Sequence, residues 1–154
     1  MLARNSCATG SLETDSLAGP LRWRLVARGE ERQLAILRRW ISSLLPACPG
    51  RDDVVMVANE LASNAIRHTA SGRDGWFAVE MTWYGNLVRV AVADCGGPKE
   101  PVVIEDPGGE SGRGLFLVQQ LSAGMGMSGN HSGRWVWADI TWAAATHRPV
   151  EPRL

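Results

Sequence analysis

The spacing of hydrophobic side chains changes several times along the chain, and each change marks a new element. Over residues 21–28 every odd position is apolar and most even positions are arginine, which predicts a strand with one buried face. Over residues 30–45 apolar side chains recur every three or four positions, which predicts an amphipathic helix with its arginines outward. The folded part of the chain is therefore expected to begin with a strand followed by a helix.

A second helix is predicted over residues 52–68. The sequence Cys-Pro-Gly at 48–50 is expected to end the preceding helix, and Asp52 has a side chain suited to a helix N-cap. The apolar arc of the second helix consists of Val55, Ala58, Leu61, Ala62, Ala65 and Ile66. The two helices together are expected to form one layer of the fold.

The second half of the chain contains several runs with strand character. Residues 76–84 and 87–94 are separated only by Gly85-Asn86, which predicts an antiparallel hairpin. Residues 95–113 hold five glycines and three prolines, and we interpret this long loop as a lid. The pattern is completed by a short helix over 114–122, a weaker strand near 124–128 and a strand over 134–142.

This order of elements predicts an α/β (α+β) fold. We expect a two-layer sandwich in which helices cover one face of a mixed, mostly antiparallel sheet. The domain is expected to span residues 20–146. Residues 1–19 lack hydrophobic periodicity and are interpreted as a flexible leader, and residues 147–154 as a C-terminal tail.

Length, charge and cysteine content narrow the function classes. A chain of 154 residues suits one domain, and 16 basic side chains balance 16 acidic ones, so the overall charge does not favour a nucleic acid partner. No apolar run approaches the ~18 residues of a membrane-spanning helix, and no export signal is evident, so we expect a cytoplasmic protein. Cys7, Cys48 and Cys95 form no Cys-x-x-Cys pair, which argues against a disulfide framework or a zinc site.

Three polar residues of the second predicted helix share one face. Glu60, Asn64 and His68 follow one another at four-residue intervals, at the edge of the apolar arc, where a pocket can open. The amide oxygen of Asn64 suits Mg²⁺, a hard cation that proteins often hold with few groups plus substrate phosphates. The alternative is a solvated helix face without a ligand.

Two glycine-containing turns carry further candidate groups. Asp94 ends a hydrophobic strand just before Gly96-Gly97, where its carboxylate suits a ligand amine; the alternative is that Asp94 stabilises its own turn. Ser111-Gly112-Arg113-Gly114 precedes the third helix, so its backbone N–H groups suit a phosphate; the alternative is an ordinary glycine-rich loop. Neither sequence is a P-loop or a dinucleotide fingerprint.

Taken in order, three segments resemble the nucleotide-binding boxes of the Bergerat (GHKL) ATPase superfamily. They are ELASNAIRH at 60–68, VADCGG at 92–97 and GRGLFLVQQL at 112–121. That superfamily includes DNA gyrase, heat-shock chaperone ATPases, mismatch-repair ATPases and sensor histidine kinases. The ending of the first box and the opening of the third are similar to those of the small anti-sigma-factor serine kinases. The resemblance covers residues 21–142.

The resemblance implies ATP and Mg²⁺ as cofactors and a role for each matching residue. Glu60 would be the general base, Asn64 would ligate Mg²⁺, and Asp94 would accept the exocyclic amine of adenine. Gly96 would line the base. Gly112 and Gly114 would let lid amides reach the phosphates, and the side chain of Arg113 would contact a phosphate or a partner protein. The first glycine box departs from the superfamily pattern D-x-G-x-G, because it reads DCGGPKEP.

The activity implied is that of an ATP-dependent serine/threonine kinase. Such a protein would bind a sigma factor and transfer the γ-phosphate of ATP to a serine of an anti-sigma-factor antagonist. A homodimer, but neither nucleic acid nor a membrane, is among the implied partners. Three alternatives stay open: an ATP-binding regulatory module with weak catalysis, a sensor-histidine-kinase catalytic domain, and a scaffold that binds no ATP.

Overall fold

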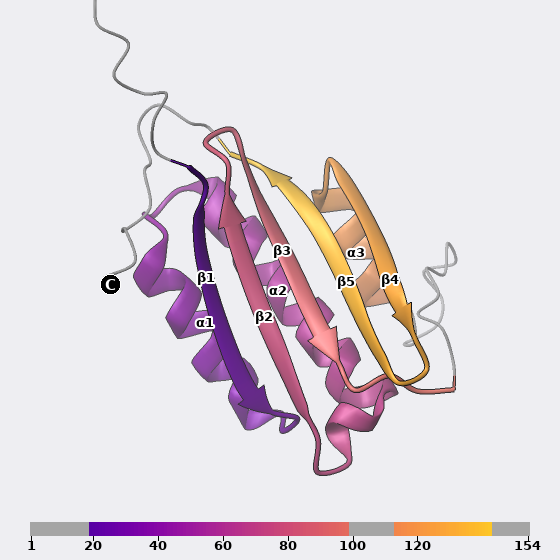
Figure 1. Ribbon diagram of the computed structural model, residues 1–154. Helices are drawn as coiled ribbons and strands as arrows, with labels where there is room; N and C mark the ends of the chain where they lie inside the picture. The colour runs from indigo at the N-terminus through magenta and orange to yellow at the C-terminus, as the bar shows by residue number, and fades with distance from the viewer. Residues whose placement is uncertain (1–18, 99–112, 143–154) are drawn as a thin grey trace, which may run out of the picture.

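The structure is a computed structural model that describes residues 19–98 and 113–142. Within these ranges the elements follow the predicted order (Figure 1). They are β1 (Leu21–Arg28), α1 (Arg32–Leu44), α2 (Pro49–His68), the short 3-10 helix η1 (Ala70–Gly72), β2 (Trp76–Trp83), β3 (Leu87–Asp94), α3 (Arg113–Leu121), β4 (Gly124–Asn130) and β5 (Gly133–Thr141). Almost all of the predicted leader, most of the predicted lid and the predicted tail lie outside the described residues.

The five strands form one sheet in the order β1-β2-β3-β5-β4. The predicted hairpin of β2 and β3 is confirmed, and its turn contains Gly85 with a φ of 93°. The weaker strand is also confirmed as β4, at the edge of the sheet. Every described strand pair is antiparallel, in a sheet that was expected to be mixed but mostly antiparallel. The reason is that β4 and β5 form a second hairpin whose inner strand lies beside β3.

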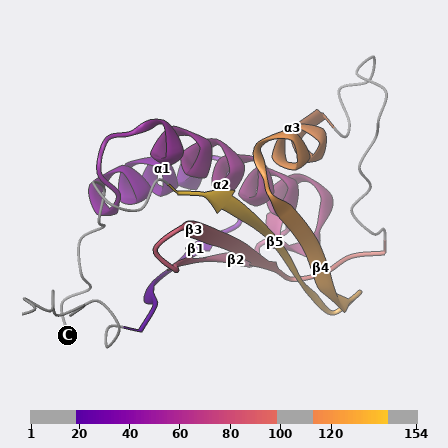
Figure 2. The same cartoon turned by 90° about the horizontal axis from the view of Figure 1, so that it is seen from above.

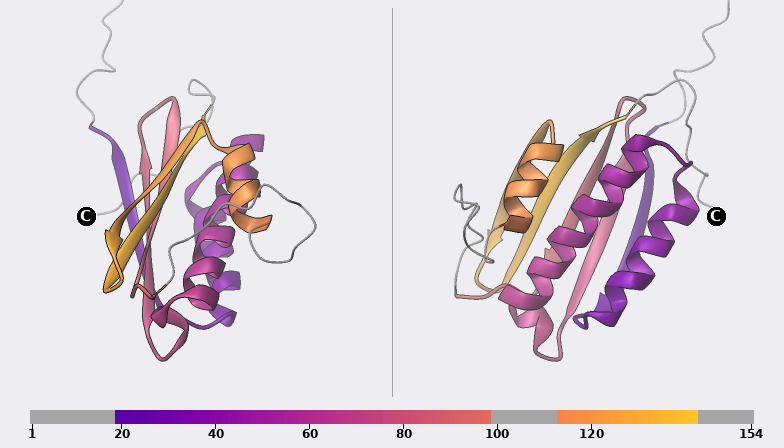
Figure 3. Two further views of the ribbon diagram at one scale, coloured as in Figure 1. Left: turned by 90° about the vertical axis from the view of Figure 1, so that its right-hand side faces the viewer. Right: turned by 180° about the vertical axis from the view of Figure 1, so that it is seen from behind.

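All three α-helices lie on one face of the sheet, as the two-layer prediction requires (Figure 2). Seen from that side, α2 crosses the middle of the sheet between α1 and α3 (Figure 3). The core between the layers consists of fully or almost fully buried aliphatic side chains, among them Leu37, Ile41, Val54, Val57, Leu61, Val88, Val90 and Val92. Burying each of them contributes roughly 1.5–3 kcal/mol of transfer free energy. This core fixes α2 over the central strands.

The helix α2 begins earlier than predicted, at Pro49, so Asp52 lies within its first turn and the N-cap prediction for Asp52 is wrong. The reason is that proline has no N–H to leave unpaired, and its fixed φ suits the first helical position. The buried face is also rotated slightly, because Val54 and Val57 are fully buried while Val55 is half-buried. None of the helices in the described ranges is long and apolar enough to cross a bilayer.

The opposite face of the sheet has no helix over it in the part of the chain that the structure describes (Figure 2). On this face Arg89 of β3 binds Asp139 of β5 through two hydrogen bonds, Nε to Oδ1 at 2.7 Å and Nη2 to Oδ2 at 2.8 Å. The bonded carboxylate raises the pKa of Arg89, whose guanidinium carbon also lies 4.2 Å from the ring centroid of Trp137. Trp76 and Trp135 are exposed here.

Candidate functional site

The first and third sequence boxes meet where α2 passes α3. Glu60 is half-buried in α2, and its carboxylate lies against Gly114 in the first turn of α3. A Cβ on Gly114 would overlap Oε2 of Glu60 and would lie 3.4 Å from Cδ. A side chain at this position would therefore displace the carboxylate of Glu60. The positive end of the α3 dipole favours a carboxylate at this place.

Asn64 and His68 follow Glu60 along α2, as predicted. Asn64 is half-buried, and its side-chain amide makes no hydrogen bond to any of the described residues. His68 is exposed, and its carbonyl oxygen lies 3.4 Å from the place of a Cβ on Gly97. Glu60 and His68 are about 12 Å apart along the helix axis. One helix thus touches α3 at Glu60 and the loop after β3 at its C-terminal end.

Asp94 is the last residue of β3 and points to the helix-covered side of the sheet, in alternation with Ala93. It is 5% exposed, and its Oδ1 accepts a hydrogen bond from the backbone N–H of Gly96 at 2.6 Å. Asp94 therefore does stabilise its own turn. Burial raises the pKa of Asp94, while the Gly96 hydrogen bond and the charge of Arg134 act in the opposite direction. A buried carboxylate with a raised pKa is a common feature of functional sites.

The loop that follows Asp94 is fastened to the segment after α2. The amide of Cys95 donates to Oγ of Ser71 at 2.9 Å, and the amide of Ala70 donates to the carbonyl of Gly96 at 2.8 Å. Ser71 is fully buried and is held by Thr69, whose Oγ1 accepts from the Ser71 amide at 3.1 Å. Ser71 was not among the predicted site residues. These hydrogen bonds fix the second box relative to the first.

Gly96 has a φ of 74°, a left-handed conformation that L side chains rarely adopt. A Cβ on Gly96 would overlap the carbonyl oxygen of His131 and would lie 2.7 Å from the amide nitrogen of Gly133. This glycine therefore allows the loop after β3 to pack on the turn between β4 and β5. Its contact with a nucleotide base stays a prediction.

Arg134 is a residue of this site that sequence reasoning missed. It pairs with Asp94 in the β3–β5 register and is 6% exposed. Its Nη2 donates to the carbonyl of Gly97, and its Nε donates to the carbonyl of Asn130 at 3.3 Å. A signal was present in the sequence, because the other even positions of the run 134–142 are apolar. A period of two therefore places this arginine on the buried face.

The remaining predicted residues are only partly described. Arg113 begins α3 and is exposed, whereas Gly112 lies outside the described residues. Among the residues that the structure covers, no group of three or more His, Cys, Asp or Glu side chains is placed to hold a metal ion. Glu60 and Asn64 carry oxygen donors, and such hard donors fit an Mg²⁺ ion held mainly by phosphates.

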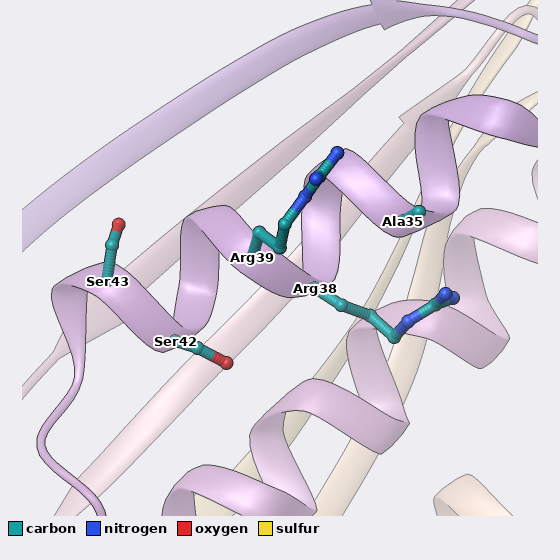
Figure 4. Close-up of a pocket in the computed structure, with 5 residues that line it drawn as sticks. All are labelled: Ala35, Arg38, Arg39, Ser42 and Ser43. Carbon is teal, nitrogen blue, oxygen red and sulfur yellow. The ribbon is translucent and has the colours of Figure 1, made fainter.

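A surface hollow of about 580 Å³ lies elsewhere, on the helix α1. The residues that line it are Ala35, Arg38, Arg39, Ser42 and Ser43 (Figure 4). Arg38 extends from this surface to α2, where its Nη1 donates to Oδ1 of Asn59 at 2.8 Å. None of these residues belongs to the three sequence boxes, so the hollow is not the predicted nucleotide site.

A layer of helices on one face of an antiparallel sheet, with three boxes connected through α2, defines a class of protein, the GHKL-type ATPase domain. Residues 27–140 match the family model of the Histidine kinase-like ATPase domain, and the chain belongs to this family. No curated protein sequence matches the chain. Membership of the family confirms the superfamily that the three boxes predict, and it implies ATP binding.

Proposed function

We propose that this protein is an ATP-dependent protein serine/threonine kinase of the anti-sigma-factor type. The observation that carries the proposal is the double contact of α2. Its residue Glu60 lies against Gly114 of the third box, and the segment after His68 is bonded to the loop of the second box. A nucleotide whose base lies near Asp94 and whose phosphates lie near α3 would span the two places where α2 meets the other boxes.

Each box residue has a proposed role in binding. Asp94 would accept a hydrogen bond from the exocyclic amine of adenine, because a carboxylate oxygen is an acceptor. Asn64 would hold Mg²⁺ through its amide oxygen, and the ion would neutralise phosphate charge. The backbone amides of Gly112 and Gly114 and the side chain of Arg113 would contact the phosphates. Gly96 would lie beside the base.

The proposed reaction is transfer of the γ-phosphoryl group to a serine of a partner protein. The serine oxygen attacks the γ-phosphorus, a new O–P bond forms, and the bond from phosphorus to the β,γ-bridging oxygen breaks as ADP leaves. Glu60 accepts the proton of the serine hydroxyl. Alignment and charge neutralisation supply most of the acceleration in phosphoryl transfer, and a positioned base typically adds about 10²–10⁴-fold.

The partners we propose are a sigma factor, which is regulated by binding, and an anti-sigma-factor antagonist, which supplies the serine. We propose a cytoplasmic homodimer, with neither nucleic acid nor a membrane as partner. Protein partners are supported by the sheet face opposite the helices, where, within the described residues, Trp76 and Trp135 are 45% and 36% exposed. Tryptophan is enriched in protein interfaces. Sedimentation equilibrium of the wild type and of Trp135→Ser would test the dimer.

A second candidate is a regulatory module of the same fold that binds ATP with little catalysis. It is favoured by the position of Glu60, whose carboxylate lies against the start of α3. A carboxylate that remains there when ATP binds would not act as a base. In that case ATP would serve to order a protein-binding surface.

Binding and transfer are tested separately. Calorimetric titration with Mg·ATP should give clear binding to the wild type and at least about tenfold weaker binding to Asn64→Ala and Asp94→Ala. Asn59→Ala is the matched control, because Asn59 lies on the same helix and binds Arg38 instead. Equal binding by all four proteins would contradict the site.

Transfer is measured with γ-labelled ATP and purified antagonist proteins that carry a phosphoacceptor serine. Glu60→Gln should bind ATP and transfer at least about 10² times more slowly than the wild type. Glu31→Gln, with an exposed side chain on another helix end, is the matched control. Binding without transfer in the wild type would favour the regulatory module.

A further inference from the structure

Arg134 is buried to a degree that is unusual for an arginine. It is 6% exposed and lies on the helix-covered side of β5, directly opposite Asp94 of β3. Arginine is almost never fully buried unless it is paired, because removing its charge from water costs several kcal/mol. A residue of this kind in the core face of a strand calls for a specific reason.

The described contacts of Arg134 join two parts of the chain. Nη2 donates to the carbonyl of Gly97, in the loop that follows Asp94, and Nε donates to the carbonyl of Asn130 at 3.3 Å, at the end of β4. A guanidinium is planar and presents several N–H donors in a fixed arrangement, so it is well suited to bridge two acceptors. Arg134 thereby connects the loop after β3 to the hairpin of β4 and β5.

The same loop is held from the other side by the segment after α2. Cys95 donates to Ser71, and Gly96 accepts from Ala70. Arg134 supplies the connection on the β5 side. The loop is consequently fixed between two elements, and the carboxylate of Asp94 lies at its first residue.

We propose that Arg134 is a positioning residue for recognition of the nucleotide base: it holds Asp94 and the Gly96-Gly97 loop so that the carboxylate meets the exocyclic amine of adenine. This inference rests on the proposed nucleotide site. It adds a residue that lies outside all three boxes and that acts through Asp94 without itself contacting the reacting phosphate.

The charges around Asp94 support this role. Burial raises the pKa of Asp94, and the charge of Arg134 is one of the two effects that lower it. A carboxylate oxygen that carries no proton can accept a hydrogen bond from an amine. Two histidines near the loop, His68 and His131, approach it through their backbone carbonyls. Among the described residues, Arg134 is a basic side chain whose charge acts on Asp94.

The test compares three ligands on the full chain. ATP carries the exocyclic amine, inosine triphosphate carries a carbonyl in its place, and inorganic tripolyphosphate carries no base. The wild type should bind ATP at least about tenfold more tightly than inosine triphosphate, which is the value of one hydrogen bond to a charged group. Arg134→Met should lose most of this preference while its affinity for tripolyphosphate stays within about twofold of the wild type.

The control is Arg89→Met. Arg89 is also a hydrogen-bonded arginine, but it lies on the neighbouring strand β3 and on the opposite face of the sheet. The variant should keep the preference for ATP. A general structural role of Arg134 would instead weaken all three ligands equally, and that result would overturn the proposal. Retention of the full ATP preference in Arg134→Met would overturn it too.

A further variant covers the case in which Arg134→Met does not fold. Arg134→Lys keeps the charge, but its single nitrogen cannot occupy the positions of both Nε and Nη2, the two guanidinium nitrogens that donate to the carbonyls. It should show a smaller loss that is again confined to ATP, and an undiminished preference would contradict the role. If the wild type binds none of the three ligands, the proposed function itself fails. If it binds ATP and inosine triphosphate equally, the base-recognition roles of Asp94 and Arg134 fail, while ATP binding and phosphoryl transfer stay open to the tests above.

Discussion

The carboxylate of Glu60 and the backbone of Gly114 are in contact, although one residue lies in α2 and the other in the first turn of α3. A side chain at position 114 would displace this carboxylate, because its Cβ would overlap Oε2 of the glutamate. This contact joins the proposed base to the helix that is expected to receive the phosphates. It also makes the glycine as important to the position of Glu60 as to any ligand.

Replacing Gly114 with alanine should therefore displace the carboxylate of Glu60. Alanine raises helix propensity by about 0.5–1 kcal/mol, so the fold should survive despite the new contact. We expect the transfer rate at saturating ATP to fall by about 10²-fold, toward that of an enzyme without a positioned base. Gly124→Ala is the control, because nothing lies within 4 Å of a Cβ at that position. A wild-type rate in Gly114→Ala would show that the contact has no part in catalysis.

A second pair of glycines separates backbone strain from steric overlap. Gly85 and Gly96 both have positive φ values, 93° and 74°, but only Gly96 faces other atoms, those of His131 and Gly133. Alanine at Gly85 should cost about 1–2 kcal/mol of unfolding free energy from its φ alone. Alanine at Gly96 should cost about 1–3 kcal/mol more, because the loop must move away from the β4–β5 turn.

Urea denaturation of both variants measures this difference. Equal costs for Gly85→Ala and Gly96→Ala would mean that the turn moves without resistance. In the expected case, ATP binding should also weaken in Gly96→Ala, because the loop carries Asp94 at its start. Gly85 lies in the turn between β2 and β3, so its variant should bind ATP as the wild type does.

The sequence alone predicted the local elements well, because each has its own period. The alternation over β1 and the three-to-four spacing over α1 appear in the structure at nearly the predicted bounds. Contacts between distant segments were not predictable in the same way. The pairing of Asp94 with Arg134 depends on the β4–β5 hairpin returning beside β3, and a strand pattern specifies neither its neighbour nor its register.

The candidate site shows the same division. Glu60, Asn64 and Asp94 were identified from residue types and spacing, and the turn bond of Asp94 was one of the two interpretations considered. Arg134 was overlooked because it belongs to no box, although an arginine in the buried register of a strand is itself a signal. The start of α2 was misplaced because Pro49 was interpreted as a terminator instead of a first helical residue.

The ion pair of Arg89 and Asp139 offers a test of side-chain geometry on the uncovered face of the sheet. Its two hydrogen bonds of 2.7 and 2.8 Å join side chains that are 40% and 15% exposed, so solvent screens the pair only in part. A double-mutant cycle should give a coupling free energy near 1 kcal/mol, the upper end for partly exposed pairs, and it should fall with added salt. The pair of Arg22 and Glu80, with its longer distance of 3.6 Å and greater exposure, should give almost none. Similar coupling free energies in both pairs would contradict the expected benefit of two short hydrogen bonds between one arginine and one carboxylate.

The final prediction concerns pH and follows from the burial of Asp94. Its folded-state pKa is raised above the ordinary value of an aspartate, with burial as the largest cause. The folded protein therefore holds the proton more tightly than the unfolded chain does. Its contribution to stability is complete below the unfolded-state pKa and is lost as pH rises through the raised pKa. Above the raised pKa the ionised carboxylate therefore contributes less to stability than the protonated form does below it.

Asp94→Asn should consequently be more stable than the wild type at pH values above the raised pKa, because an amide oxygen can still accept from Gly96 without becoming charged. The difference in unfolding free energy should shrink as the pH is lowered through the raised pKa toward the acidic range. Denaturant titrations at several pH values measure it, with Asp74→Asn as the control for the same change at an exposed turn. An unfavourable effect of Asp94→Asn above the raised pKa would mean that Arg134 more than compensates for burial. In the expected case the variant should also lose stabilisation by ATP in thermal denaturation. A carboxylate that is kept at the expense of stability, and that is needed for a ligand, is explained by function and not by folding.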